Sequence, residues 1–339
     1  MASILPYELV LERHPSVREW LHLLSSLGRA PATLDAYGRA LTHFLLHCET
    51  SGQVPELVTF EQVTLYIRNL LPGQPQAVAN ATLHQRLAAI RLWYDHLVFQ
   101  GRCRQNPVPR GQHSRMVQIP GHAGFTRGLV PRLIKFPDIP NDEQWACLLR
   151  VAAMASVRDR LMLALAYCGA LRRGELVGLR VEDLDVAHRL IKLRAETTKS
   201  RRTRVVCYSP AVAPVLIKHL QQLRSDGWRN GPLFRSNSDR NRGAPLTRWT
   251  WSKTVAAWAG KADTSCFSTH TFRHLRLTHL ARAGWRLHEL TAYAGHRDSK
   301  TTLVYLHLSG ADLTAKMAQS VAHLDARMFS ELFSAEPAL

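Results

Sequence analysis

Long apolar runs and acidic side chains are both scarce in this sequence. No stretch approaches the roughly 18 apolar residues that a membrane-spanning helix needs, and the amino-terminal residues lack the basic and apolar regions of a secretion signal. Only 26 Asp and Glu residues stand against 44 Lys and Arg, for a formal net charge of +18 over 339 residues. The sequence therefore predicts a cytoplasmic protein that binds a polyanion such as DNA or RNA. Charge alone leaves open a basic surface without such a partner, or one that faces a membrane.

Cysteines are few and scattered. The six cysteines form no CxxC pair and no cluster with histidine at zinc-site spacing. They are typical of free thiols in a reducing compartment, and we expect no bound metal. No cluster of carboxylates accompanies the histidines, which argues against a metal-dependent nuclease.

Apolar residues recur at helical spacing through the first hundred residues. Ser16 and Glu19 fit a capping box ahead of one apolar stripe, and Thr59 with Gln62 precedes another. We therefore expect a small helical bundle with helices at 16–28, after Thr33, after Thr59 and at 80–99.

The periodicity breaks up between Gly101 and Pro140. Six prolines fall in this stretch, and its seven Arg and Lys residues meet a single acid, Asp138. A structureless stretch of this length inside one compact domain is uncommon, so we expect a boundary here. Its charge is consistent with a segment that follows a phosphate backbone or with a solvated surface segment. The predicted organisation is a helical domain at 1–105, a basic linker at 106–140, a second domain at 141–310 and a carboxy-terminal helix or tail at 311–339.

The second half predicts a mainly helical domain with a small sheet. In residues 190–209, Ile191 and Leu193 alternate with charged side chains, and a polar turn separates them from Val205 and Val206. This pattern favours a two-stranded hairpin with a basic tip. Helical spacing predicts helices at about 141–153, 157–168, 210–224 and 247–259, and apolar spacing continues beyond them.

Several residues in this half suit phosphodiester chemistry without a metal. Such a reaction needs cations on the nonbridging oxygens, a nucleophile, and an acid for the leaving oxygen. Arg172 follows one helix, while His270 and Arg273 lie three apart on one face of another. Two arginines from separate segments can clamp a phosphate. Each residue alone is weak evidence in a chain this basic.

The order of these motifs is more specific than any one of them. The series is GALRRGEL at 169–176, TTKSRRTR at 197–204, HTFRH at 270–274, AGH at 294–296, and a tyrosine nine residues later. Over about 140–310 it resembles the tyrosine recombinases, also called the phage integrase family. The resemblance implies a mainly α fold, in which a helical core-binding domain precedes an α+β catalytic domain with a small antiparallel sheet.

The resemblance assigns roles position by position. It implies that Tyr305 is the nucleophile, that Glu175 is the acid of the first motif, and that His274 has a packing or supporting role. The other implied catalytic residues are Arg172, Lys199, His270, Arg273 and His296. Arg201, Arg202 and Arg204 lie close to Lys199, which makes that lysine the least secure assignment, and they are candidate DNA contacts. Tyr293 is the nearest competitor of Tyr305, but an apolar run surrounds it and favours a buried helical position.

Three positions depart from the family pattern. Phe272 stands where leucine is usual, Ala294 replaces the leucine of the usual LGH, and Arg173 occupies a commonly apolar place. None of these changes removes a catalytic group.

The implied reaction requires no ATP, Mg²⁺ or other cofactor. A tyrosine with a pKa near 10 is only about a thousandth ionised at neutral pH, so it needs a base or a positive field to attack. Attack by Tyr305 would leave a 3′-phosphotyrosine and a free 5′-OH protonated by Lys199. The family further implies a homotetramer that joins two DNA duplexes through a Holliday junction. The carboxy-terminal helix would dock on a neighbouring protomer or pack on its own domain.

The sequence thus predicts a site-specific DNA recombinase that acts on double-stranded recombination sites, in integration, excision or resolution of a mobile element. A Xer-like recombinase that resolves chromosome dimers is an alternative. A type IB topoisomerase or telomere resolvase fits the short helical first domain less well. A catalytically inactive DNA-binding or architectural protein would be expected to have lost one of the six catalytic positions.

Overall fold

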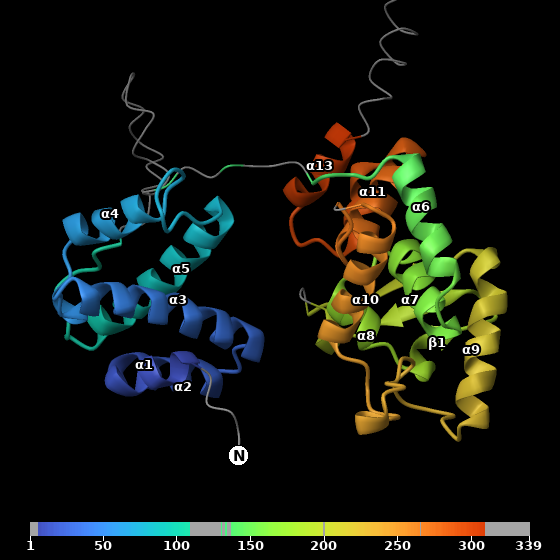
Figure 1. Ribbon diagram of the computed structural model, residues 1–339, viewed down its shortest axis with the longest axis horizontal. Coiled ribbons are helices and arrows are strands. Elements are labelled where there is room, and N and C mark those ends of the chain that lie inside the picture. The colour runs from blue at the N-terminus through green and yellow to red at the C-terminus, as the bar shows by residue number, and fades with distance from the viewer. Residues whose placement is uncertain are drawn as a thin grey trace, which may run out of the picture. The chain divides into compact units, whose positions relative to one another are not determined.

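The chain forms two compact units, Met1–Lys135 and Phe136–Leu339 (Figure 1). The computed structural model describes residues 6–108, 130, 133, 137–198, 201–264 and 266–308. No helix within these ranges is long and apolar enough to cross a membrane. The predicted carboxy-terminal helix at 311–339 lies outside the described residues.

The described part of the first unit is helical, as the periodicity predicts. Long helices α3 and α5 pack on each other, and their buried faces carry aromatic residues such as Phe44, Trp93 and Tyr94. At the start of α4 the predicted capping box is present, because the Thr59 and Gln62 side chains each bond the other residue's backbone N–H. The elements are α1 (Pro6–Arg13), α2 (Pro15–Ser26), α3 (Pro31–Thr50), the short 3₁₀ helix η1 (Pro55–Leu57), α4 (Phe60–Asn69) and α5 (Asn80–Phe99).

The predicted capping role of Ser16 is wrong. Helix α2 begins one residue earlier, at Pro15, and His14 occupies the N-cap position. Proline suits the first helical position because its missing N–H would have no partner there. Ser16 is buried instead, and its hydroxyl donates to Glu56 at 3.2 Å.

Parts of the predicted linker pack into the first unit. Val108 and Val130 are buried in its core. The Arg91 side chain donates to the Val108 carbonyl at 3.1 Å, and the Asn106 amide donates to Asp95 at 2.8 Å. Val108 and Val130 therefore contribute to the first core, whereas residues 137–140 belong to the second unit.

The second unit is mainly helical with one small sheet. The predicted hairpin is present as β2 and β3, an antiparallel pair in which Leu190 faces Cys207 and Leu193 faces Arg204. A two-residue strand, β1, extends it to the order β1-β2-β3. The helices are α6 (Asp142–Ala153), α7 (Val157–Cys168), α8 (Arg173–Val177), α9 (Ala213–Ser225), α10 (Arg248–Lys261), α11 (Thr271–Arg282), α12 (Leu287–Ala294) and α13 (Lys300–Leu308). The strands are β1 (Leu184–Asp185), β2 (Leu190–Leu193) and β3 (Arg204–Cys207), and the 3₁₀ helices are η2 (Val181–Asp183), η3 (Ala195–Thr197), η4 (Pro210–Val212) and η5 (Asp239–Asn241).

Two clusters of apolar side chains organise this unit. In the larger one, Phe272 of α11 is fully buried among the rings of Trp145, Trp251 and Phe267, so the core accommodates phenylalanine where leucine is usual. The smaller cluster joins α11, α12 and α13 and includes Tyr305. Packing of these three helices brings segments that are distant in sequence to one place.

Candidate active site

Arg172 lies at the turn between α7 and α8, where it precedes the first helical residue of α8. Its backbone N–H donates to the Glu175 carboxylate at 2.8 Å, and its guanidinium donates to the same carboxylate at 2.9 Å. A third bond, at 3.3 Å, runs from Arg172 to the carbonyl of Gly295. Arg172 is thus fixed both to its own turn and to the segment after α12.

Arg204 of β3 binds both oxygens of the same Glu175 carboxylate. Two parallel bonds of 2.8 Å join them, and the side chains of Arg204 and Glu175 are only 8% and 1% exposed. Burial alone would raise the pKa of Glu175, but the bonds and charges of Arg204 and Arg172 outweigh it and lower the pKa to about 2. One ionised carboxylate therefore holds two arginines from different elements.

Arg273 of α11 is the most deeply buried cation of the site. Its guanidinium donates to the carbonyl of Ala170 at 2.7 Å and to that of Ala294 at 2.6 Å. Burial, and then the charge of Arg172, lower its pKa to about 9, so the side chain is still mainly protonated at neutral pH. Its placement depends on backbone carbonyls, which match the N–H donors of a guanidinium.

His296 lies between Arg273 and α13. Its Nε2 is 2.9 Å from an Arg273 nitrogen, and its Nδ1 is 2.8 Å from the hydroxyl of Thr302. Because arginine can only donate, Nε2 accepts and Nδ1 carries the proton toward Thr302. Burial, followed by the charge of Arg273, lowers the pKa of His296 to about 3.

Tyr305 of α13 lies against this histidine. The two rings are parallel within 5°, with centroids 6.3 Å apart, and Tyr305 is only 3% exposed. Its hydroxyl is 2.9 Å from Nδ1 of His274. Burial raises the pKa of Tyr305, although the charges of Arg273 and Arg172 oppose this effect. The phenol is therefore protonated at neutral pH and must lose its proton to act as a nucleophile.

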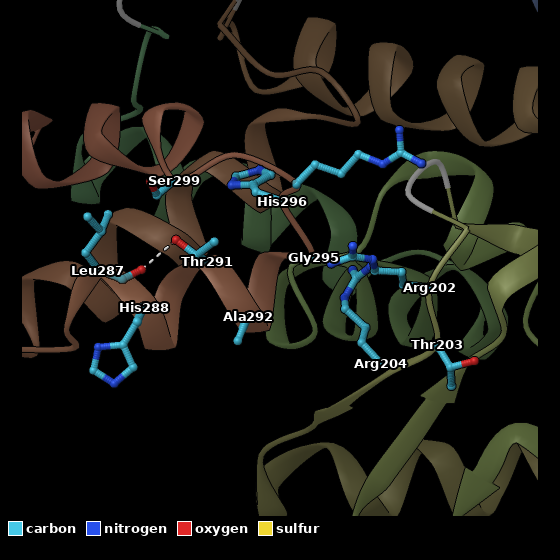
Figure 2. Close-up of a pocket in the computed structure, with 11 residues that line it drawn as sticks. Arg202, Thr203, Arg204, Leu287, His288, Thr291, Ala292, Gly295, His296 and Ser299 are labelled. Carbon is cyan, nitrogen blue, oxygen red and sulfur yellow. Dashed lines mark hydrogen bonds between the residues drawn. The ribbon is translucent and has the colours of Figure 1, made fainter.

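The remaining predicted residues lie at the edge of this network or outside the described chain. His270 is exposed and directly precedes α11, with its ring centroid 6.2 Å from that of His274. Lys199 lies outside the described residues. Arg201 is exposed on the hairpin, and so is Arg202. With Arg204, His296 and other residues, Arg202 lines a cavity of about 570 Å³ between the hairpin and α12 (Figure 2).

Tyr293 and Arg173 have contacts of their own. The Tyr293 hydroxyl donates to the carbonyl of Cys168 at 2.7 Å, and burial raises the pKa of this phenol. Arg173, the departure from an apolar position, donates to Ser252 at 2.8 Å and lies over the ring of Trp249. Among the described residues, no group of three or more His, Cys, Asp or Glu side chains is arranged to hold a metal ion.

Residues 141–311 match the phage integrase family, which covers the whole network from Arg172 to Tyr305. The chain belongs to this family. As a tyrosine recombinase it is an enzyme of DNA strand cleavage and rejoining. The family and the fold class expected from the sequence are both confirmed.

Curated relatives align along most of the chain. The tyrosine recombinase XerC of Pelobacter propionicus is 26% identical over 292 residues, which span 85% of this chain and 89% of that protein. The tyrosine recombinase XerD of Lacticaseibacillus casei is 26% identical over 310 residues, which span 89% of this chain and 97% of that protein.

Solved structures share the fold. The XerH site-specific recombinase, bound to a palindromic difH substrate, is similar with a TM-score of 0.64 and 16% identity, covering 86% of this chain and 80% of that one. The Tn1549 transposon integrase, in complex with transposon right end DNA, is similar with a TM-score of 0.63 and 18% identity. The match covers 90% of this chain and 99% of that one.

The network also contains residues that the motifs did not single out. Thr302 bonds His296, and no motif marks it beyond its position three residues before Tyr305. Arg204 was predicted as a DNA contact, whereas its guanidinium points inward to Glu175. His274, for which the resemblance implies a packing or supporting role, contacts the hydroxyl of the predicted nucleophile.

Proposed function

We propose that this recombinase cleaves DNA by attack of the Tyr305 hydroxyl on a backbone phosphate. The observation that carries the proposal is the contact network in which Tyr305 stacks on His296 and His296 bonds Arg273. A phosphate within reach of Tyr305 would thus lie beside cations that are already oriented. Such preorganised charge stabilises the transition state because no reorganisation is needed during the reaction.

The reaction conserves the energy of the phosphodiester. The bond from Tyr305 to phosphorus forms as the bond to the 5′ oxygen breaks, leaving a 3′-phosphotyrosine and a 5′-OH. Arg172 and Arg273 hold the nonbridging oxygens, and the family motif assigns His296 and His270 to the same phosphate. Lys199 protonates the leaving oxygen, an assignment that rests on the family motif. Attack by a 5′-OH from another strand then reverses the step, so the reaction needs no ATP or metal.

Two strand exchanges would proceed through a Holliday junction within a homotetramer on two double-stranded DNA sites. In this proposal, 1–105 is a core-binding domain, 106–140 a basic linker, 141–310 the catalytic domain and 311–339 a helix that docks in trans or on its own protomer. The net charge of +18 supports DNA as the partner. Exposed Arg201 and Arg202 contact the DNA phosphate backbone. Arg204 instead bonds Glu175, the carboxylate that also holds Arg172. The enzyme would act in the cytoplasm, where bacterial DNA lies.

The biological role proposed is integration, excision or resolution of a mobile element, with chromosome-dimer resolution as the alternative. A transposon integrase among the similar structures supports the first role, and the XerC and XerD relatives support the second.

Nicked suicide duplexes made from the DNA that flanks the gene test the chemistry. After cleavage the short fragment that carries the new 5′-OH is lost, so the covalent complex accumulates and migrates slowly on a denaturing gel. We expect this complex with the wild type and none with Tyr305→Phe, because the phenylalanine ring lacks the attacking oxygen. Tyr293→Phe is the matched control and should retain the complex.

A complex that persists in Tyr305→Phe would refute the nucleophile assignment. Binding of the flanking duplexes by the wild type without any covalent complex would instead favour the non-catalytic DNA-binding protein.

A further inference from the structure

His274 contacts the hydroxyl of the proposed nucleophile. It lies on α11 directly after Arg273, and its Nδ1 is 2.9 Å from the Tyr305 hydroxyl. The two rings are tilted by 36°, with centroids 5.8 Å apart. A distance of 2.9 Å is within the range that a proton acceptor needs.

We propose that His274 is the general base that removes the proton from the Tyr305 hydroxyl during strand cleavage. This inference rests on the proposed function, because it assigns a role within the attack by Tyr305. His270 of the HxxR motif is the competing acceptor, but it is exposed, and its ring lies next to His274. The geometry favours the histidine that already bonds the phenol.

The protonation state of His274 suits this role. Burial lowers its pKa to about 4, and the nearby charges of His270 and Arg273 contribute in the same direction. The titratable and charged groups that face it are Arg273 on its own helix, His270 directly before that helix, Tyr305 on α13, and His296 after α12. Above about pH 4 the imidazole is neutral, so it can accept a proton throughout the neutral range.

The proton and the electron pairs balance in one step. The proton of the Tyr305 hydroxyl moves to Nδ1 of His274 as the oxygen forms its bond to phosphorus. The bond from phosphorus to the 5′ oxygen breaks, and that oxygen takes its proton from Lys199. The negative charge of the scissile phosphate offsets the imidazolium that forms beside Arg273. During rejoining His274 returns the proton to the departing tyrosine oxygen.

His274→Asn tests the base role, because the Asn side chain can still accept a hydrogen bond but takes up no proton at neutral pH. We expect single-turnover cleavage of the suicide duplex to slow by about 10²- to 10⁴-fold, the range typical of a general base. DNA affinity and thermal unfolding should stay unchanged. His279→Asn is a matched control, since His279 lies on the same helix and its Nδ1 bonds Tyr167 at 2.7 Å.

Replacing Tyr305 with a fluorinated tyrosine separates a base from a structural support. A fluorinated phenol is more acidic and needs less help to ionise. In His274→Asn it should recover most of the lost rate, whereas in the otherwise unchanged enzyme it should bring little gain. If His274→Asn slows cleavage equally with tyrosine and with fluorinated tyrosine at position 305, the proposal is overturned. Cleavage by His274→Asn at or above the wild-type rate would overturn it too.

A substrate with sulfur in place of the bridging 5′ oxygen separates the base from the acid. Its leaving group departs without protonation, so it should restore Lys199→Ala but not His274→Asn. Rescue of His274→Asn by this substrate would reassign His274 to the leaving group. If the wild type forms no covalent complex, the proposed function has failed; if it forms one and His274→Asn forms it equally fast, only the base assignment has failed.

Discussion

The carboxylate of Glu175 should contribute about 3 kcal/mol to the stability of the catalytic unit. Its pKa falls from an ordinary value of 4.5 to about 2, and each pKa unit corresponds to about 1.4 kcal/mol. At 1% exposure the side chain has little solvent to screen it. Glu175→Gln keeps the shape but removes the charge, and its amide N–H₂ then faces the N–H donors of Arg204 or Arg172. We expect a loss of about 3 kcal/mol at pH 7, within the range for breaking a buried ion pair.

Hydrogen exchange followed by mass spectrometry measures this loss locally. The slowest amides of α8 and β3 should exchange about two orders of magnitude faster in Glu175→Gln, because about 1.4 kcal/mol corresponds to a factor of ten. Amides of α3 and α5 in the first unit serve as the internal control and should not change. If the free energy of opening in the second unit differs by less than about 1 kcal/mol between wild type and Glu175→Gln, the predicted contribution of the Glu175 charge is refuted.

The pH dependence of the same difference is a second test. A carboxylate whose pKa is lowered in the folded state stabilises the protein above its unfolded pKa and loses this effect as the pH falls toward the folded pKa. Urea denaturation should therefore show the gap between wild type and Glu175→Gln closing between about pH 4.5 and pH 2. A gap that does not vary with pH would mean that charge is not its origin.

Two further substitutions test the segment from α12 to α13. Thr302→Val removes the acceptor for Nδ1 of the partly buried His296. We expect the free energy of unfolding in urea to fall by about 1 to 3 kcal/mol and suicide-duplex cleavage to slow. Unchanged values would contradict a tautomer with the proton on Nδ1. Gly295→Ala puts a side chain at a φ of +62° and 2.9 Å from the Arg204 guanidinium. This substitution should lower the free energy of unfolding by about 1 to 2 kcal/mol or more. Wild-type stability together with full formation of the covalent complex would contradict that expectation.

Helix positions were largely predictable because each depends on local apolar spacing. Helix α5 spans Asn80–Phe99, as the pattern predicts, and the predicted hairpin within 190–209 is present as β2 and β3. Strand β1 was missed because two residues are too few to show a period. Ser16 was misread because a capping motif does not reveal that Pro15 begins the helix or that Glu56 binds the serine from a distance.

The site was predictable where a motif specifies it and not where tertiary packing does. The motifs gave Arg172, Arg273, His296 and Tyr305, and the fold brings these four together. The inward direction of Arg204 depends on Glu175, which lies 29 positions earlier, so local sequence carries no sign of it. The contact of His274 likewise depends on how α13 packs on α11.

The turn after α12 positions the two arginines through its backbone. The carbonyl of Ala294 accepts from Arg273 and that of Gly295 accepts from Arg172, so two consecutive peptide groups set the spacing between the guanidiniums. The side chain at 294 takes no part in these bonds, which explains why alanine can replace the usual leucine without loss of the site. A search for active relatives should therefore require the left-handed glycine and its peptide geometry, and should tolerate variation in the residue before it.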